Sequence, residues 1–175
     1  MFDTSFDYSF IQRKPTADPD IPFEHIFQFR TNHRRYIVIV EEYRFDIFIV
    51  KFYPANRKND DNRFQVILNE YQFAPIIRTC INIMLEFLKE NPLASFGYIG
   101  ANSIIDGFEE AKSLTQRFRI YDYVMAIFLK TESFMRLYSE KNSAALLLNL
   151  KHENIDKLIA DAKEMFVRIY PDLES

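Results

Sequence analysis

The stretch YIVIVEEYRFDIFIVKFYP, residues 36–54, decides the fold class of this chain. It is dense in Ile, Val, Phe and Tyr, the residue types that fit the pleated, half-buried surface of a β-sheet. Read as the segments 36–43 and 44–54, it predicts two neighbouring strands joined by a short connection.

Further strands are predicted on both sides of this stretch. In PFEHIFQFR, residues 22–30, Phe and His alternate with polar side chains, and RFQVILN, residues 63–69, alternates in a similar way. These segments bring the total to about four antiparallel N-terminal strands. Residues 1–21 are predicted to form an edge strand or a strap, from the alternation in SFDYSF, followed by a Pro-rich loop.

Three helices are predicted where apolar residues recur at i, i+3 and i+4. The elements expected after residue 73 are a helix over 74–91, a short buried strand over 95–101, a helix over 107–130 capped by Asp106, a hairpin of 134–140 with 143–151, and a helix over 153–170. The prediction is a single α+β domain, residues 1–175. In it, an antiparallel sheet of about four N-terminal strands plus later strands packs against three main helices.

The composition argues against several kinds of site. The chain has only 3 Gly, so no Gly-rich loop can cradle phosphates, and its 3 His show no spacing typical of a metal site. Cys80 is the only cysteine and falls on the apolar stripe of a predicted helix, where a thiol behaves as a small hydrophobe. We therefore expect no cofactor and no metal, and no catalytic residue stands out.

The N-terminus and the hydropathy pattern bear on location. The segment MFDTSFDYSF is acidic where a signal peptide needs a basic start and an apolar run. No stretch approaches the roughly 18 apolar residues of a membrane span. We expect a cytoplasmic protein with no membrane contact.

The helix predicted over 107–130 carries the first candidate binding residues, which are Arg117, Arg119, Tyr121 and Tyr123. At about 100° per residue, Phe118 marks the buried face and the two arginines flank it, so both are expected at the border between core and water. There the guanidinium groups can reach solvent, an acid or an aromatic ring, which explains them without a ligand. Ile120 and Ile127 fall on the opposite face, which predicts a helix that is sandwiched within the domain or part of an interface.

A second candidate is the turn TNHRR, residues 31–35, with Arg34 and Arg35. The planar fork of Arg can hold a phosphate or an acidic partner, so this hairpin tip could contact nucleic acid. The alternative is a solvated turn. The net charge of -3 argues against a nucleic-acid partner, because such proteins are usually basic.

Acidic and basic residues also occur within the predicted strands. EEYRFDIFIVK contains Glu41, Glu42, Asp46 and Lys51. They do not have the Glu-x-Lys spacing of a restriction-type nuclease, so we expect no nuclease site here.

The segments IIRTCINIMLEFLKENPLASFGYIGA and QRFRIY are similar to small bacterial α+β proteins that form a domain of unknown function. The resemblance covers about a third of the chain. It rests on an R-x-x-T-I helix, a Y-I strand and an R-x-R helix, and this chain departs from the first of these with Cys80 before Ile81. It implies a bacterial, cytosolic α+β protein and no particular activity, with Arg78, Arg117 and Arg119 as the matching arginines.

Three functions remain open from the sequence. The first is a non-enzymatic interaction protein, such as an adaptor, an immunity or antitoxin-like partner or a regulatory subunit. It would act through an aromatic and Arg-bearing surface, on a protein partner or on a second copy in a homodimer. The second is a small-ligand protein or unfamiliar enzyme, with a pocket between the sheet and the 107–130 helix. The third is nucleic-acid binding through the hairpin at 30–35.

Overall fold

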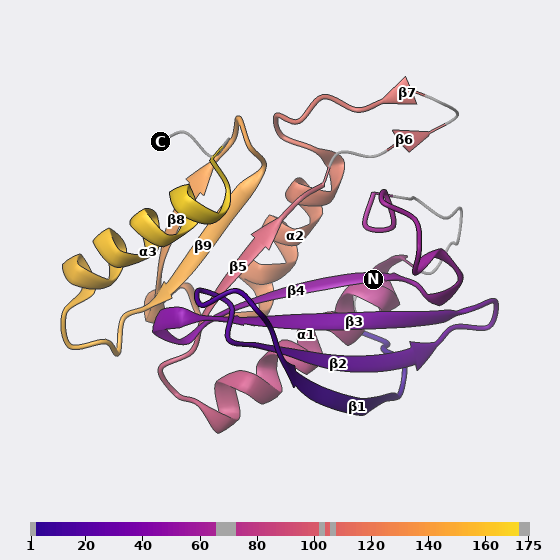
Figure 1. The fold of residues 1–175 in the computed structure, drawn as a ribbon, viewed down its shortest axis with the longest axis horizontal. Helices are drawn as coiled ribbons and strands as arrows, with labels where there is room; N and C mark the ends of the chain where they lie inside the picture. Colours follow the sequence, from indigo (N-terminus) through magenta and orange to yellow (C-terminus); the bar gives the residue numbers. More distant parts are fainter. Residues whose placement is uncertain (1–2, 66–72, 102–103, 106–107, 172–175) are drawn as a thin grey trace.

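The computed structural model describes residues 3–65, 73–101, 104–105 and 108–171 (Figure 1). Its main sheet has seven strands in the order β1-β2-β3-β4-β5-β9-β8. In that order the strands are Tyr8–Pro15, Phe23–Arg30, Arg35–Tyr43, Ile47–Pro54, Ser95–Ile99, Ala144–Asn149 and Phe134–Ser139. A separate two-stranded ribbon consists of β6, Ile104–Ile105, and β7, Phe108–Glu109.

Three helices flank the main sheet: α1, Phe73–Glu90, α2, Gln116–Phe128, and α3, Ile155–Ile169. Neighbouring strands are antiparallel except β4 and β5, which are parallel. A parallel pair needs a crossover connection, and α1 lies in the segment that joins the two strands. The chain therefore forms an antiparallel meander first and then returns through α1 to extend the same sheet.

Apolar side chains of β3 and β4 point to both faces of the sheet. Val38, Val40 and Phe48 belong to the core under α1 and α2, whereas Tyr43 and Ile47 belong to the core under α3. Since side chains of a strand point alternately to opposite faces, consecutive apolar residues in a strand require cover on both sides. The two cores supply that cover, and the continuous apolar run IFIV of β4 is explained by them.

The helices bury the faces that their periodicity predicts. On α1, Ile76, Ile77 and Ile83 are all buried, so its apolar arc is wide. On α3, Leu158, Ala162 and Phe166 form a narrower buried stripe. Asn154 caps α3, accepting a hydrogen bond from the Lys157 backbone N–H at 3.0 Å.

The predicted class, α+β with three main helices on a mostly antiparallel sheet, is confirmed. The strand count differs, because the later strands join the N-terminal meander in one sheet of seven. The strand predicted over 63–69 is wrong for its described part, because Arg63–Gln65 form a turn; the rest of that segment lies outside the described residues. Instead β1 takes this place at the edge and runs through Arg13–Pro15, where a loop was predicted. An edge strand tolerates Pro because it has no partner on its outer side.

The start of α2 was also predicted wrongly. It begins at Gln116 and not near residue 107, and Phe108–Glu109 form β7 instead. The cap is Thr115, whose hydroxyl accepts from the Phe118 backbone N–H at 3.1 Å. Asp106, the predicted cap, lies outside the described residues.

Candidate functional site

Helix α2 separates the four residues that the sequence singled out into two pairs. Arg117 is buried, with 6% of its surface exposed, and Tyr121, one turn later, is half-buried. Arg119 is exposed, and so is Tyr123, at 63%. Both arginines were expected at the border of the core, which is wrong for both of them: α2 is rotated so that Arg117 faces inward and Arg119 faces water.

The N-terminus of α2 is held against the end of β5 by close backbone contact. The Thr115 hydroxyl donates to the Gly100 carbonyl oxygen at 2.7 Å. A Cβ atom at Gly100 would lie 2.3 Å from the Phe118 backbone nitrogen, so only glycine fits there. This contact fixes where Arg117 and Tyr121 enter the interior.

Strands β4 and β5 diverge beyond a short parallel pairing, as Figure 1 shows. The paired residues run only from Ile47 opposite Ser95 to Ile49 opposite Gly97. The gap holds a cavity of about 190 Å³, which we call the window. Its lining residues come from both faces of the sheet and are Ile49, Val50, Lys51, Phe52, Phe64, Ile99, Ala101, Arg117, Tyr121 and Tyr170.

The charged side chains that line the window are both cations. Arg117 donates from its guanidinium to the carbonyl oxygen of Phe64, and Lys51 forms an ion pair with Glu41. Tyr121 lies near Arg117, and burial raises the pKa of the Tyr121 hydroxyl above its ordinary value. The phenol is therefore a neutral hydrogen-bond donor at physiological pH.

A buried polar network supports Lys51 from the α3 side. Tyr43 donates to a Glu41 carboxylate oxygen at 2.5 Å, and the hydroxyls of Tyr43 and Tyr170 lie 2.8 Å apart. Burial alone would lower the pKa of Lys51, but the Glu41 carboxylate and Tyr170 outweigh it and raise that pKa. For Tyr43, burial and then the charge of Glu41 raise the pKa far above that of a free phenol. Lys51 therefore stays charged at the wall of the window.

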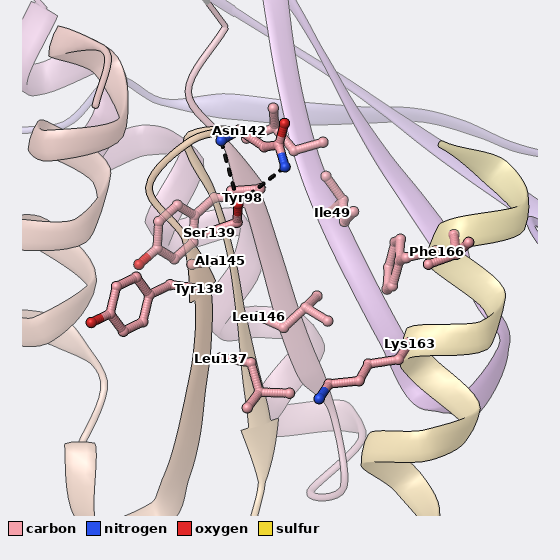
Figure 2. Close-up of a pocket in the computed structure, with 13 residues that line it drawn as sticks. Ile49, Tyr98, Leu137, Tyr138, Ser139, Asn142, Ala145, Leu146, Lys163 and Phe166 are labelled. Carbon is pink, nitrogen blue, oxygen red and sulfur yellow. Dashed lines mark hydrogen bonds between the residues drawn. The ribbon is translucent and has the colours of Figure 1, made fainter. Parts of the chain in front are cut away.

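A second cavity, of about 330 Å³, lies between α3 and the β8–β9 hairpin. Figure 2 shows Leu137, Leu146 and Phe166 pointing into it and Lys163 extending across its mouth. One end is closed by the hairpin turn, where the Asn142 amide donates to Ser139 Oγ at 3.0 Å. This cleft is almost entirely apolar.

The outer surface of α2 adjoins β8 through an ion pair. An Arg136 guanidinium nitrogen lies 2.6 Å from Asp122 Oδ1, and the Tyr98 hydroxyl donates to the same oxygen at 2.6 Å. The Arg136 guanidinium also stacks over the ring of Tyr138, 4.1 Å from its centroid. Tyr138 is 55% exposed. Arg136 and Tyr138 therefore place a guanidinium group and an aromatic ring together at this edge of the sheet.

Of the other two candidate residues, Arg34 lies in the connection between β2 and β3, as predicted, and Arg35 is the first residue of β3. The turn is closed by the Thr31 backbone N–H, which donates to the Arg34 carbonyl oxygen at 2.9 Å. Arg34 is half-buried and Arg35 is exposed. Figure 1 shows this connection at one end of β2 and β3, away from α2, so it is a separate candidate from the four residues of that helix.

Sequence reasoning missed Glu41, Tyr43 and Tyr170. Glu41 and Lys51 were considered for one chemistry only and set aside because of their spacing along the chain. The available signal was their position. Glu41 and Lys51 each interrupt an apolar strand at a position whose side chain points into the protein. A buried charge needs a partner.

Comparisons with protein-family models, with curated proteins and with solved structures found no match. The described residues hold no group of three His, Cys, Asp or Glu side chains that could bind a metal ion. None of the helices in the described ranges has the length and apolar character needed to cross a membrane.

Proposed function

We propose that this chain is a non-enzymatic interaction protein that binds by strand addition at β8, and that the added strand is β8 of a second copy. The supporting observation is that the two edges of the sheet differ in protection. At one edge, β1 has a bulge between Phe10 and Gln12, two cationic residues and a terminal Pro. At the other edge, all six residues of β8 pair with β9 without interruption, and β8 contains neither Pro nor Lys. Bulges, Lys and Pro are the usual means of blocking an edge.

The backbone groups of β8 that face outward follow from the ladder. The Leu150 backbone N–H donates to the Ser133 carbonyl oxygen at 2.9 Å, one step beyond the β8–β9 register. In an antiparallel pair, hydrogen-bonded residues alternate with those whose groups point away. Phe134, Arg136 and Tyr138 therefore direct their N–H and C=O groups to the open edge. Each hydrogen bond made there contributes about 0.5–1.5 kcal/mol net.

The register of the second copy follows from symmetry and charge. A two-fold axis perpendicular to the sheet would relate the two β8 strands of the dimer. Residues that lie opposite each other across this axis point to the same face, so they are an even number of positions apart in the sequence. The axis therefore passes beside one residue of β8, which lies opposite its own copy. With Arg136 on the axis, two guanidinium groups would be opposed, which is unfavourable. With Leu137 on the axis, each Arg136 lies opposite Tyr138 of the second copy, which extends the stacking already present within one chain.

Sedimentation equilibrium on the purified protein tests this proposal. Tyr138→Lys places a charge on the open edge and is expected to weaken the dimer at least tenfold. Phe10→Lys is the matched control, because Phe10 is an aromatic residue of similar exposure, 57%, on the other edge strand. A parent protein that stays monomeric at all accessible concentrations, or equal weakening by both substitutions, would contradict the proposal.

A cysteine cross-link tests the register. In a Cys80→Ala background, Leu137→Cys would place two thiols at a non-hydrogen-bonded pair, where Cα atoms lie about 4.5 Å apart and a disulfide can form. We expect a covalent dimer under mild oxidation. Ile11→Cys on β1 is the control, and an equal yield from it would indicate random collision instead of β8 pairing.

A further inference from the structure

We propose that the window between β4 and β5 binds a small aromatic carboxylate. This site is separate from the β8 edge, and the inference does not depend on self-association.

The shape of the window comes from the divergence of two parallel strands. Consecutive residues Ile49 to Phe52 all line it, although alternate ones belong to opposite faces of the sheet. A cavity lined in this way lies along the edge of β4 and is in contact with side chains of both faces of the sheet. Small-molecule sites in sheets with parallel strands favour the place where neighbouring strands separate at their carboxyl ends.

The lining residues indicate the class of ligand. Phe52, Phe64, Tyr121 and Tyr170 are aromatic and offer flat apolar surfaces to a planar ring. Lys51 and Arg117 supply positive charge from different walls. Burying charged groups beside a cavity is costly, and such groups are concentrated at functional sites. An aromatic ring bearing an anion satisfies both parts of the lining.

The charge balance favours a carboxylate over a phosphate. Glu41 already neutralises much of the charge of Lys51 through their ion pair, so the window suits a monoanion better than a dianion. The planar Arg117 guanidinium matches the planar carboxylate group, with which Arg forms paired hydrogen bonds. The neutral hydroxyl of Tyr121 can donate to the same anion.

The test is isothermal titration calorimetry with benzoate, benzamide and inorganic phosphate. Benzamide has the same shape as benzoate without its charge. We expect benzoate to bind at least tenfold more tightly than either of the other two. Absence of benzoate binding, equal binding of benzamide, or tighter binding of phosphate would overturn the proposal.

Variants on α2 locate the site. Arg117→Gln should weaken benzoate binding at least tenfold, and Arg117→Lys should restore part of it. Arg119→Gln is the matched control, since Arg119 lies on the same helix but is exposed, and it should bind as the parent does. Equal loss in both variants would refute the assignment.

If Arg117→Gln does not fold, the parent protein still decides the question. In amide chemical-shift mapping, benzoate should move the signals of Lys51, Phe52 and Ile99, which line the window. Movement confined to Leu137 and Leu146 would place benzoate in the α3 cleft and overturn the proposal.

Discussion

Replacing Lys51 by Met tests whether the network beside the window is one coupled unit. The substitution removes the amine that pairs with Glu41 and keeps much of its aliphatic volume. The side chain of Glu41 is 10% exposed and that of Lys51 is 27% exposed. Removing one partner of a buried ion pair costs about 3–5 kcal/mol, because it leaves a buried charge without compensation.

Two features of the structure place the expected cost below that range. Lys51 is partly exposed, so water can replace some of what the ion pair provides. Tyr43 still donates to the Glu41 carboxylate at 2.5 Å, and a hydrogen bond to a charged group contributes about 1.5–3 kcal/mol. We therefore expect Lys51→Met to lower the free energy of unfolding by about 2 kcal/mol. For a chain of this size that corresponds to a fall in Tm of about 4–8 °C.

Urea unfolding at neutral pH measures this cost through the midpoint of the transition, provided that its slope is unchanged. The decisive quantity is the coupling with Glu41→Gln in a double-mutant cycle. The double variant carries no buried charge at this place, so it should be no less stable than Lys51→Met alone, with a coupling of about 1–2 kcal/mol. Additive costs would refute the reasoning. Lys157→Met is the control, because Lys157 pairs with Asp161 on the exposed face of α3 and should cost no more than about 0.5 kcal/mol.

Three further predictions concern single residues. Burial raises the pKa of the Cys80 thiol to about 12, so a thiol reagent at mildly alkaline pH should react with it only after unfolding, and rapid reaction of the native protein would contradict its placement. Hydrogen bonds, chiefly from Arg168, hold the pKa of Asp20 below its ordinary 3.8. The ionised Asp20 carboxylate therefore stabilises the folded state above that pH, and this contribution is lost as the pH falls below it. Urea melts should therefore show Asp20→Asn to be less stable than the parent protein at neutral pH, with a smaller difference in acid. A difference that grows in acid would contradict the lowered pKa of Asp20. Gly100→Ala should cost about 3 kcal/mol in the same assay, because the new Cβ atom meets the backbone of Phe118, and a near-neutral result would mean that α2 is not held at this point.

The parts of the fold that could be predicted depend on local pattern. The alternation along 36–54 and the helical spacing over 74–91 and 153–170 each arise within one element, so they can be read without knowing the neighbours. The start of α2 could not be read in this way, because the apolar spacing continues upstream of Thr115. The hydroxyl of Thr115 was a local signal for the start of the helix. The sharp turn just before it, where Leu114 has a φ of 48°, is not visible in the apolar spacing.

The candidate site depends on distant contacts, and this limits what the sequence reveals. The periodicity of α2 correctly places Arg117 and Arg119 on different flanks of Phe118. It does not say which flank will be covered. That choice is made by Phe64, whose carbonyl oxygen accepts from Arg117 although it lies 53 residues away in the chain. The pairing of Glu41 with Lys51 likewise requires the β3–β4 register, in which Glu41 lies opposite Ile49.

The window originates in the brevity of β5. This strand pairs with β4 over three residues and with β9 over four, so it belongs more to the second half of the sheet than to the first. Gly100, at its end, is drawn to the N-terminus of α2 by the Thr115 hydroxyl, which turns the chain away from β4 and leaves the window. A longer β5 would close the window by pairing with Val50 to Phe52, so a cavity lined by cations persists here only because the strands separate.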